Sequence, residues 1–129
     1  TLLISGSAMS GEKPLQDISQ LVWKNRIILI FSTDTDPSFE SLFEQYDDQI
    51  KDRDIVWFVS KGSQVTTNYS GELSSEFSSR VKSRFLTENG SVLLIGKDGG
   101  VKARSQQLNL NAIFTQIDSM PMRQQEMGL

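Results

Sequence analysis

Two short, unbroken apolar runs constrain the fold of this chain more than any other feature. They are Arg26-Ile-Ile-Leu-Ile-Phe31 and Asp54-Ile-Val-Trp-Phe-Val59. Runs of this length and β-branched or aromatic content are typical of strands that are covered on both faces. Between them, Asp36-Pro37 predicts the start of a helix, and apolar residues recur at helical spacing from Phe39 to Ile50. A parallel strand pair joined by a right-handed helical crossover is the economical arrangement.

Two further helices are predicted from apolar periodicity. An apolar residue at every fourth position from Leu73 to Phe85 predicts a helix that ends near Asn89-Gly90. The spacing from Leu110 to Ile117 predicts a last helix, with Asn109 as its N-cap and Pro121 as its end.

A hairpin is predicted between these two helices. Ser91–Ile95 is a third apolar run, and Asp98-Gly99 is the kind of pair that forms a tight turn, since primed turns need positive φ. Val101–Ser105 alternates apolar and charged residues, so we expect an edge strand on which Lys102 and Arg104 hinder further pairing.

The remaining segments complete the predicted core. Pro14 to Leu21 is expected to form a short helix, with Trp23 packed between it and the sheet, and Val65–Tyr69 is an optional extra strand. The predicted order is β-α-β-α-β-β-α. We therefore expect an α/β fold, a three-layer sandwich around a central four-stranded mixed sheet with an edge hairpin.

Composition limits both the number of domains and the chemistry. The chain has 129 residues, no cysteine and no histidine, and its 13 Lys and Arg against 16 Asp and Glu give a net charge of −3. One domain, residues 11–129, accommodates this length. Thiolate chemistry and zinc–cysteine sites need cysteine, and a serine–histidine triad needs histidine. Without a basic stripe, nucleic acid is not expected as a partner, and no apolar stretch is long enough for a membrane span.

The first ten residues differ in kind from the rest. Residues 1–10 are small or apolar and carry no charge, and Ala8 and Ser10 stand where a signal peptidase accepts small side chains. We expect this segment to be the remnant of a signal peptide, which predicts a periplasmic or secreted protein. The alternative is a flexible native or vector-derived leader.

Three short segments resemble a family of uncharacterised bacterial proteins. They are Trp23-Lys-Asn-Arg26, Ile95-Gly-Lys-Asp-Gly-Gly-Val-Lys102 and Met120-Pro-Met-Arg123. That family is similar to the repeated domains of Equarin-type animal extracellular matrix proteins, and the resemblance extends from Leu15 to Met127. The element order is also that of the thioredoxin-like superfamily. The resemblance implies a thioredoxin-like fold.

The same resemblance indicates where a candidate site lies, but this chain lacks the residues that carry the usual thiol chemistry there. A redox thioredoxin carries cysteines after its first strand, where this chain has Ser32-Thr-Asp-Thr-Asp36. It carries a proline before its third strand, where this chain has Asn89-Gly-Ser91. Ligands of such sheets gather outside the carboxyl ends of the parallel strands. The candidate binding residues are therefore Ser32, Thr33, Asp34, Thr35, Asp36, Ser60, Lys61, Asn89 and Gly90.

The chemistry of these residues favours binding over catalysis. Asp34 and Asp36 could contribute to a hard-cation site, but turn formation and helix capping explain them more simply, so no metal or cofactor is expected. We expect a non-catalytic, exported module that binds a protein or small ligand. The alternative is a thioredoxin-like oxidoreductase or peroxide-handling protein that works with a thiol supplied by a partner.

Overall fold

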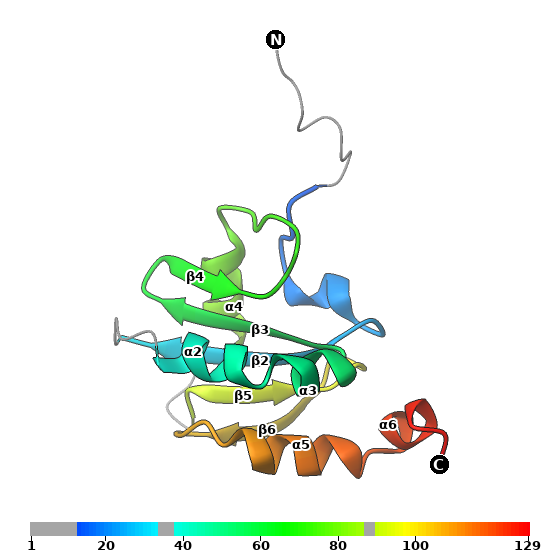
Figure 1. Cartoon of the computed structure of the whole chain (residues 1–129). Helices are drawn as coiled ribbons and strands as arrows, with labels where there is room; N and C mark the ends of the chain where they lie inside the picture. Colours follow the sequence, from blue (N-terminus) through cyan, green and yellow to red (C-terminus); the bar gives the residue numbers. More distant parts are fainter. Residues whose placement is uncertain (1–12, 34–37, 87–89) are drawn as a thin grey trace.

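The computed structural model describes residues 13–33, 38–86 and 90–129 (Figure 1). Its centre is a sheet in the order β4-β3-β2-β5-β6. The strands are β2 (Arg26–Ser32), β3 (Ile55–Lys61), β4 (Gln64–Thr67), β5 (Val92–Ile95) and β6 (Val101–Ser105). Strands β2 and β3 are parallel, and the other neighbours are antiparallel. The crossover and the hairpin predicted from the sequence are confirmed, with β6 at an edge.

The sheet has five strands, where the sequence predicted four and an optional fifth. The extra strand, β4, pairs with only the last four residues of β3. Beyond it, the Asn68 side chain continues the pairing: its Oδ1 accepts from the Trp57 amide at 2.8 Å and its Nδ2 donates to the Ile55 carbonyl at 3.2 Å. A side-chain amide thus completes the edge of β3, which extends past the short strand.

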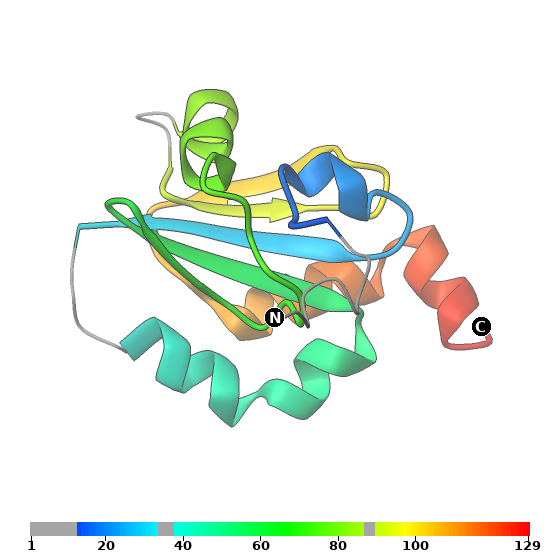
Figure 2. The ribbon, with the colours of Figure 1, turned by 90° about the horizontal axis from the view of Figure 1, so that it is seen from above.

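Helices cover both faces of the sheet (Figure 2). On one face lie η1 (Ile18–Leu21), a 3-10 helix, and α4 (Phe77–Phe85). On the other lie α2 (Ser38–Gln45), α3 (Asp47–Asp52) and α5 (Leu110–Asp118), and α6 (Pro121–Glu126) follows. Successive strand residues alternate between the two cores, because the pleat turns every second side chain to the same side. In β2, for example, Leu29 packs toward α4 and Ile30 toward α2 and α5. No described helix has the length and apolar character to cross a bilayer.

The crossover helix is broken where the sequence predicted one continuous helix. Tyr46, with φ −106° and ψ 22°, separates α2 from α3. The break leaves Phe43 and Ile50 fully buried, with the Phe43 ring stacked 4.7 Å from that of Trp57. The predicted cap Asp36-Pro37 lies outside the described residues.

Helix α4 is shorter than its apolar repeat. It begins at Phe77 and ends at Phe85, whose carbonyl accepts a hydrogen bond from Arg104 Nη1 at 3.1 Å. Leu73 is not part of the helix, because it forms an isolated β-bridge with Leu15. In this bridge the Leu15 amide donates to the Glu72 carbonyl at 2.8 Å. At the other end of the chain, Asn109 caps α5 as predicted. Pro121 starts α6, where its missing amide costs no hydrogen bond.

The loop before β2 and the β5–β6 hairpin turn meet at the end of the sheet where β2 begins. Trp23, predicted to pack inside, is 65% exposed, so that prediction is wrong. Its φ of 70° turns the side chain outward, while its amide bonds to the Lys97 carbonyl at 2.6 Å. Gly99 has the predicted positive φ, 86°, but the turn is longer than two residues: the Gly96 amide bonds to the Gly100 carbonyl at 2.9 Å.

Candidate functional site

The carboxyl ends of β2 and β3 lie side by side, on the left of Figure 1. Ser32 is in register with Lys61, and Phe31 with Ser60. The Phe31 amide also bonds to the Ser91 carbonyl at 2.9 Å, which joins the segment before β5 to the same edge. The structure therefore brings together the described parts of these segments, which are Ser32 and Thr33, Ser60 and Lys61, and Gly90 and Ser91. We call this region the C-terminal edge.

Lys61 faces the α2 side of the C-terminal edge. Its Nζ lies 3.1 Å from Glu40 Oε2, which also accepts a hydrogen bond from Thr66 Oγ1 at 2.6 Å. Burial alone would raise the pKa of Glu40, but the hydrogen bonds from Thr66 and Lys61 outweigh it and lower the pKa below its usual value. The positive charge of Lys61 is thus balanced within the domain.

Ser60 faces the opposite side, toward α4, because neighbouring residues of a strand point to opposite faces. It is 4% exposed, and its Oγ has no hydrogen-bond partner among the described residues. It lines a hollow of about 340 Å³ between the strand ends and α4, which we call the edge hollow. The lining residues are Phe31, Ser32, Thr33, Ser60, Gly62, Lys82 and Leu86.

The rim of the edge hollow combines one apolar and one basic side chain. Leu86, just after α4, is 50% exposed, which is unusual for a large apolar residue. The Lys82 ammonium donates to the Gly62 carbonyl. The hollow therefore offers apolar surface, a buried hydroxyl and a cation that is already hydrogen-bonded.

The other predicted site residues differ in where the structure places them. Thr33 is exposed at the edge hollow, whereas Asp34, Thr35, Asp36 and Asn89 lie outside the described residues. Gly90 is buried, and a Cβ added to it would lie 2.9 Å from the Ser105 amide nitrogen. Its position is explained by close packing on β6. No described group of three His, Cys, Asp or Glu residues is arranged to hold a metal ion.

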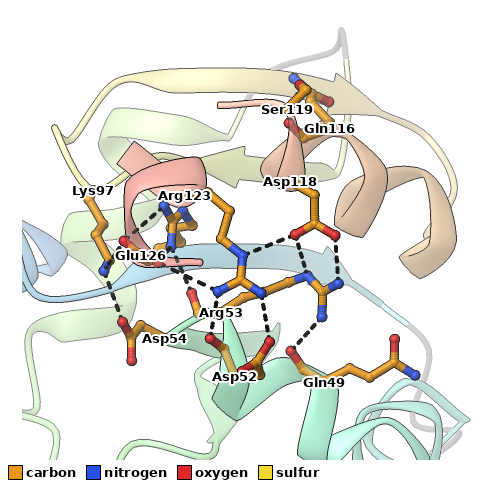
Figure 3. Close-up of polar contacts among 11 residues, drawn as sticks. Gln49, Asp52, Arg53, Asp54, Lys97, Gln116, Asp118, Ser119, Arg123 and Glu126 are labelled. Atoms are coloured by element: carbon orange, nitrogen blue, oxygen red, sulfur yellow. Dashed lines mark hydrogen bonds and ion pairs between the residues drawn. The ribbon is translucent and has the colours of Figure 1, made fainter. Parts of the chain in front are cut away.

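A second group of polar residues lies at the opposite end of the sheet. Four cations and four carboxylates meet there, many of them drawn in Figure 3. This charged cluster consists of Arg26, Asp52, Arg53, Asp54, Lys97, Asp118, Arg123 and Glu126. It joins the first residue of β2, the loop before β3, the hairpin turn after β5, and helix α6.

Two arginines of the charged cluster are almost completely buried. Arg26 is 1% exposed and holds Glu126 with both terminal nitrogens, at 3.0 and 3.2 Å. Arg123 is 5% exposed and bonds to Asp52 at 2.6 Å and to Asp118 at 3.0 Å. Arg53 adds a bidentate contact to Asp118 (Figure 3). Each buried arginine is ion-paired with a carboxylate, so the cluster holds α6 against the rest of the domain.

Two carboxylates of the cluster, Asp118 and Glu126, have a lowered pKa. Hydrogen bonds from Arg53 and then Arg123 lower the pKa of Asp118, against the opposing effect of burial. Burial would raise the pKa of Glu126, but Arg26 and Lys97 outweigh it and lower the pKa. Each of these two groups therefore stays ionised to a lower pH than it would in the unfolded chain.

Comparison with known families now identifies the chain. The model of a domain of unknown function, DUF4174, matches residues 17–126. The chain belongs to the DUF4174 family. No curated protein matches this DUF4174 chain. Among solved structures, the reduced 2-Cys peroxiredoxin of Plasmodium vivax is similar, with 19% identity, a TM-score of 0.50 and 84% of each chain covered.

This likeness shows that the DUF4174 chain has a thioredoxin-like fold, as its sequence predicted. At this identity the likeness concerns fold alone. The chain has no cysteine with which to perform thiol chemistry. The similarity to Equarin-type domains and a bacterial origin stay predictions.

The charged cluster is the feature that sequence reasoning missed. A signal for it existed, because each segment quoted for the family resemblance contributes one cation: Arg26, Lys97 and Arg123. The burial of Ser60 was also readable from strand alternation. It continues the face of Val56 and Phe58, both of which belong to the core on the α4 side.

Proposed function

We propose that this DUF4174 domain is a non-catalytic binding module that holds a protein partner at its C-terminal edge. The observation that supports this proposal is the edge hollow, where half-exposed Leu86 stands beside a recess. Exposed apolar side chains that flank a recess are common features of protein-binding sites. The position agrees with the rule that ligands of such sheets bind outside the carboxyl ends of parallel strands.

The side chains at this edge favour binding over reaction. A thiolate nucleophile or an imidazole base would have to come from another molecule, because the chain contains no cysteine and no histidine. Lys61 is ion-paired with Glu40, and the Lys82 ammonium is bonded to Gly62. Both amines are therefore engaged in holding the edge together.

Partner capture with matched variants tests the proposal. The full chain, immobilised, is exposed to an extract of the native host, and captured proteins are compared with those held by Leu86→Asp. We expect Leu86→Asp to lose at least one protein that the wild type retains, since a carboxylate cannot be buried at an apolar contact without cost.

Val101→Asp is the control, because Val101 is also exposed and apolar, at 38%, but lies on β6. Circular dichroism establishes that both variants are folded. Capture that is lost with Val101→Asp and kept with Leu86→Asp would contradict the choice of the C-terminal edge.

We also propose that the domain acts outside the cytoplasm. Support comes from residues 1–10, whose side chains are uncharged and which carry small side chains at Ala8 and Ser10. Fractionation of native host cells measures this, and recovery of the protein in the cytoplasmic fraction alone would contradict it.

A further inference from the structure

Ser60 carries a hydrogen-bonding group that the domain itself does not use. The residue is 4% exposed, and its Oγ has no partner among the described residues. Buried hydroxyls nearly always have a hydrogen-bond partner, because leaving one unpaired in the interior costs free energy. Ser60 also lines the edge hollow, so its unpaired hydroxyl is a candidate for pairing with a ligand that enters there.

Two neighbouring polar side chains on the α4 side are hydrogen-bonded to the backbone. The Lys82 ammonium and the Ser78 hydroxyl both donate to the Gly62 carbonyl. Lys61, next in the strand, pairs with Glu40 on the opposite face of the sheet. Among the described residues, these groups are engaged elsewhere, which leaves Ser60 Oγ for a group that enters the edge hollow.

The residues that line the hollow indicate the chemistry of the ligand beyond its hydrogen-bonding tip. Phe31 and Leu86 line the same hollow as Ser60 and provide apolar surface there. A charged tip would lose its hydration there, and the nearby cation, Lys82, is already bonded to a carbonyl. The volume of about 340 Å³ leaves room for one large side chain.

We propose that the edge hollow takes an uncharged side chain of the partner, apolar along its length and ending in one hydrogen-bonding group, as in a tyrosyl phenol. Ser60 Oγ pairs with that tip and is the specificity-determining group. This inference rests on the proposed function, because it names the kind of side chain that the C-terminal edge binds.

Two small probes that differ by one hydroxyl test the inference. N-acetyl-tyrosinamide and N-acetyl-phenylalaninamide are titrated into the ¹⁵N-labelled full chain, and amide shifts are followed by NMR. Both should perturb Phe31, Ser60 and Leu86. The tyrosine probe should bind about five- to tenfold more tightly, the ratio expected for one hydrogen bond in a protected site.

The variant Ser60→Ala should bind both probes equally, at the affinity of the phenylalanine probe. Its urea midpoint should be unchanged or higher, because the substitution removes a buried hydroxyl without leaving another group unpaired. Ser79→Ala is the control: Ser79 is an exposed α4 serine whose Oγ donates to the Glu76 carbonyl, and this variant should keep the preference.

Equal binding of the two probes by the wild type would overturn the role of Ser60, and so would a preference that survives in Ser60→Ala. Either result leaves binding at the edge intact. The inference would also be overturned if neither probe caused saturable amide shifts at residues of the edge hollow. The proposed function is decided separately, by partner capture with Leu86→Asp.

Discussion

Glycine is required at two positions of this chain for two different reasons. At Gly90 the reason is space, since a Cβ would lie 2.9 Å from the Ser105 amide nitrogen and 3.0 Å from its carbonyl oxygen. At Gly99 the reason is backbone conformation, with φ at 86°. Both residues shape the β5–β6 hairpin, one before β5 and one in the turn. Neither is replaceable by an ordinary residue without strain.

Gly99→Val should destabilise the fold by about 1–3 kcal/mol, because a β-branched residue resists positive φ. Denaturant unfolding followed by circular dichroism measures the change. Gly99→Asn is the matched control. It adds the same Cβ, 3.1 Å from Val22 Cγ2, but asparagine tolerates this φ more readily. Equal losses for the two variants would show that the Val22 contact, and not φ, sets the cost.

At the scale of elements, helix α6 is held mainly by charge. It has six residues, and Arg123 is its one buried residue. A helix this short is not stable alone, so contacts with the rest of the domain must order it. Those contacts are ionic: Arg123 reaches Asp52 and Asp118, and Glu126 reaches Arg26 and Lys97. The charged cluster therefore takes the place that apolar packing takes in α4 and α5.

Arg123→Ala should lower the free energy of unfolding by about 2 kcal/mol, because charge-assisted hydrogen bonds to Asp52 and Asp118 are lost together. Urea denaturation measures the loss. Lys51→Ala is the control: it removes an exposed ion pair to Asp47 on α3 and should leave the urea midpoint nearly unchanged, because exposed ion pairs contribute little to stability. A loss from Arg123→Ala no larger than from Lys51→Ala would show that α6 contributes little.

For the whole molecule, the two ends of the sheet are chemically different. At one end, the edge hollow leaves Ser60 Oγ unpaired and Leu86 half-exposed. At the other, the charged cluster pairs its four cations with four carboxylates. The first end is suited to binding and the second to holding the fold together. A change at one end should therefore have little effect on the other, because distant sites are usually additive.

Stability should fall in acid. Asp118 and Glu126 have pKa values below their ordinary 3.8 and 4.5. A carboxylate whose pKa is lowered by folding stabilises the fold above its unfolded pKa, and this contribution disappears as pH falls through its folded pKa. Urea midpoints should be steady from pH 7 to about 5 and then decrease below about pH 4.5.

Glu126→Gln serves as the comparison for this pH series. The variant should be less stable at pH 7 and should lose less stability on acidification, because one carboxylate with a lowered pKa no longer titrates. Parallel pH profiles for the variant and the wild type would contradict a role for Glu126 in the acid response.

Local sequence patterns were enough to predict much of the fold and part of the site. The β-branched runs of β2 and β3 and the Asn109 cap of α5 depend on neighbouring residues, so they are readable from the chain alone. The break at Tyr46 and the outward turn of Trp23 were not predictable. Both depend on backbone angles that packing against distant segments imposes.

The sequence by itself determined most of the strands and helices, most of the residues that face the core, and that the chain supplies no thiol of its own. These properties follow from periodicity and composition. Only the tertiary structure decided that Arg26 meets Glu126, 100 positions away, and that Ser60 Oγ lies at the edge hollow without a partner. The physical reason is that the pairing of charged and polar side chains depends on distances in space, which loops and strand order set, and no local pattern encodes these distances.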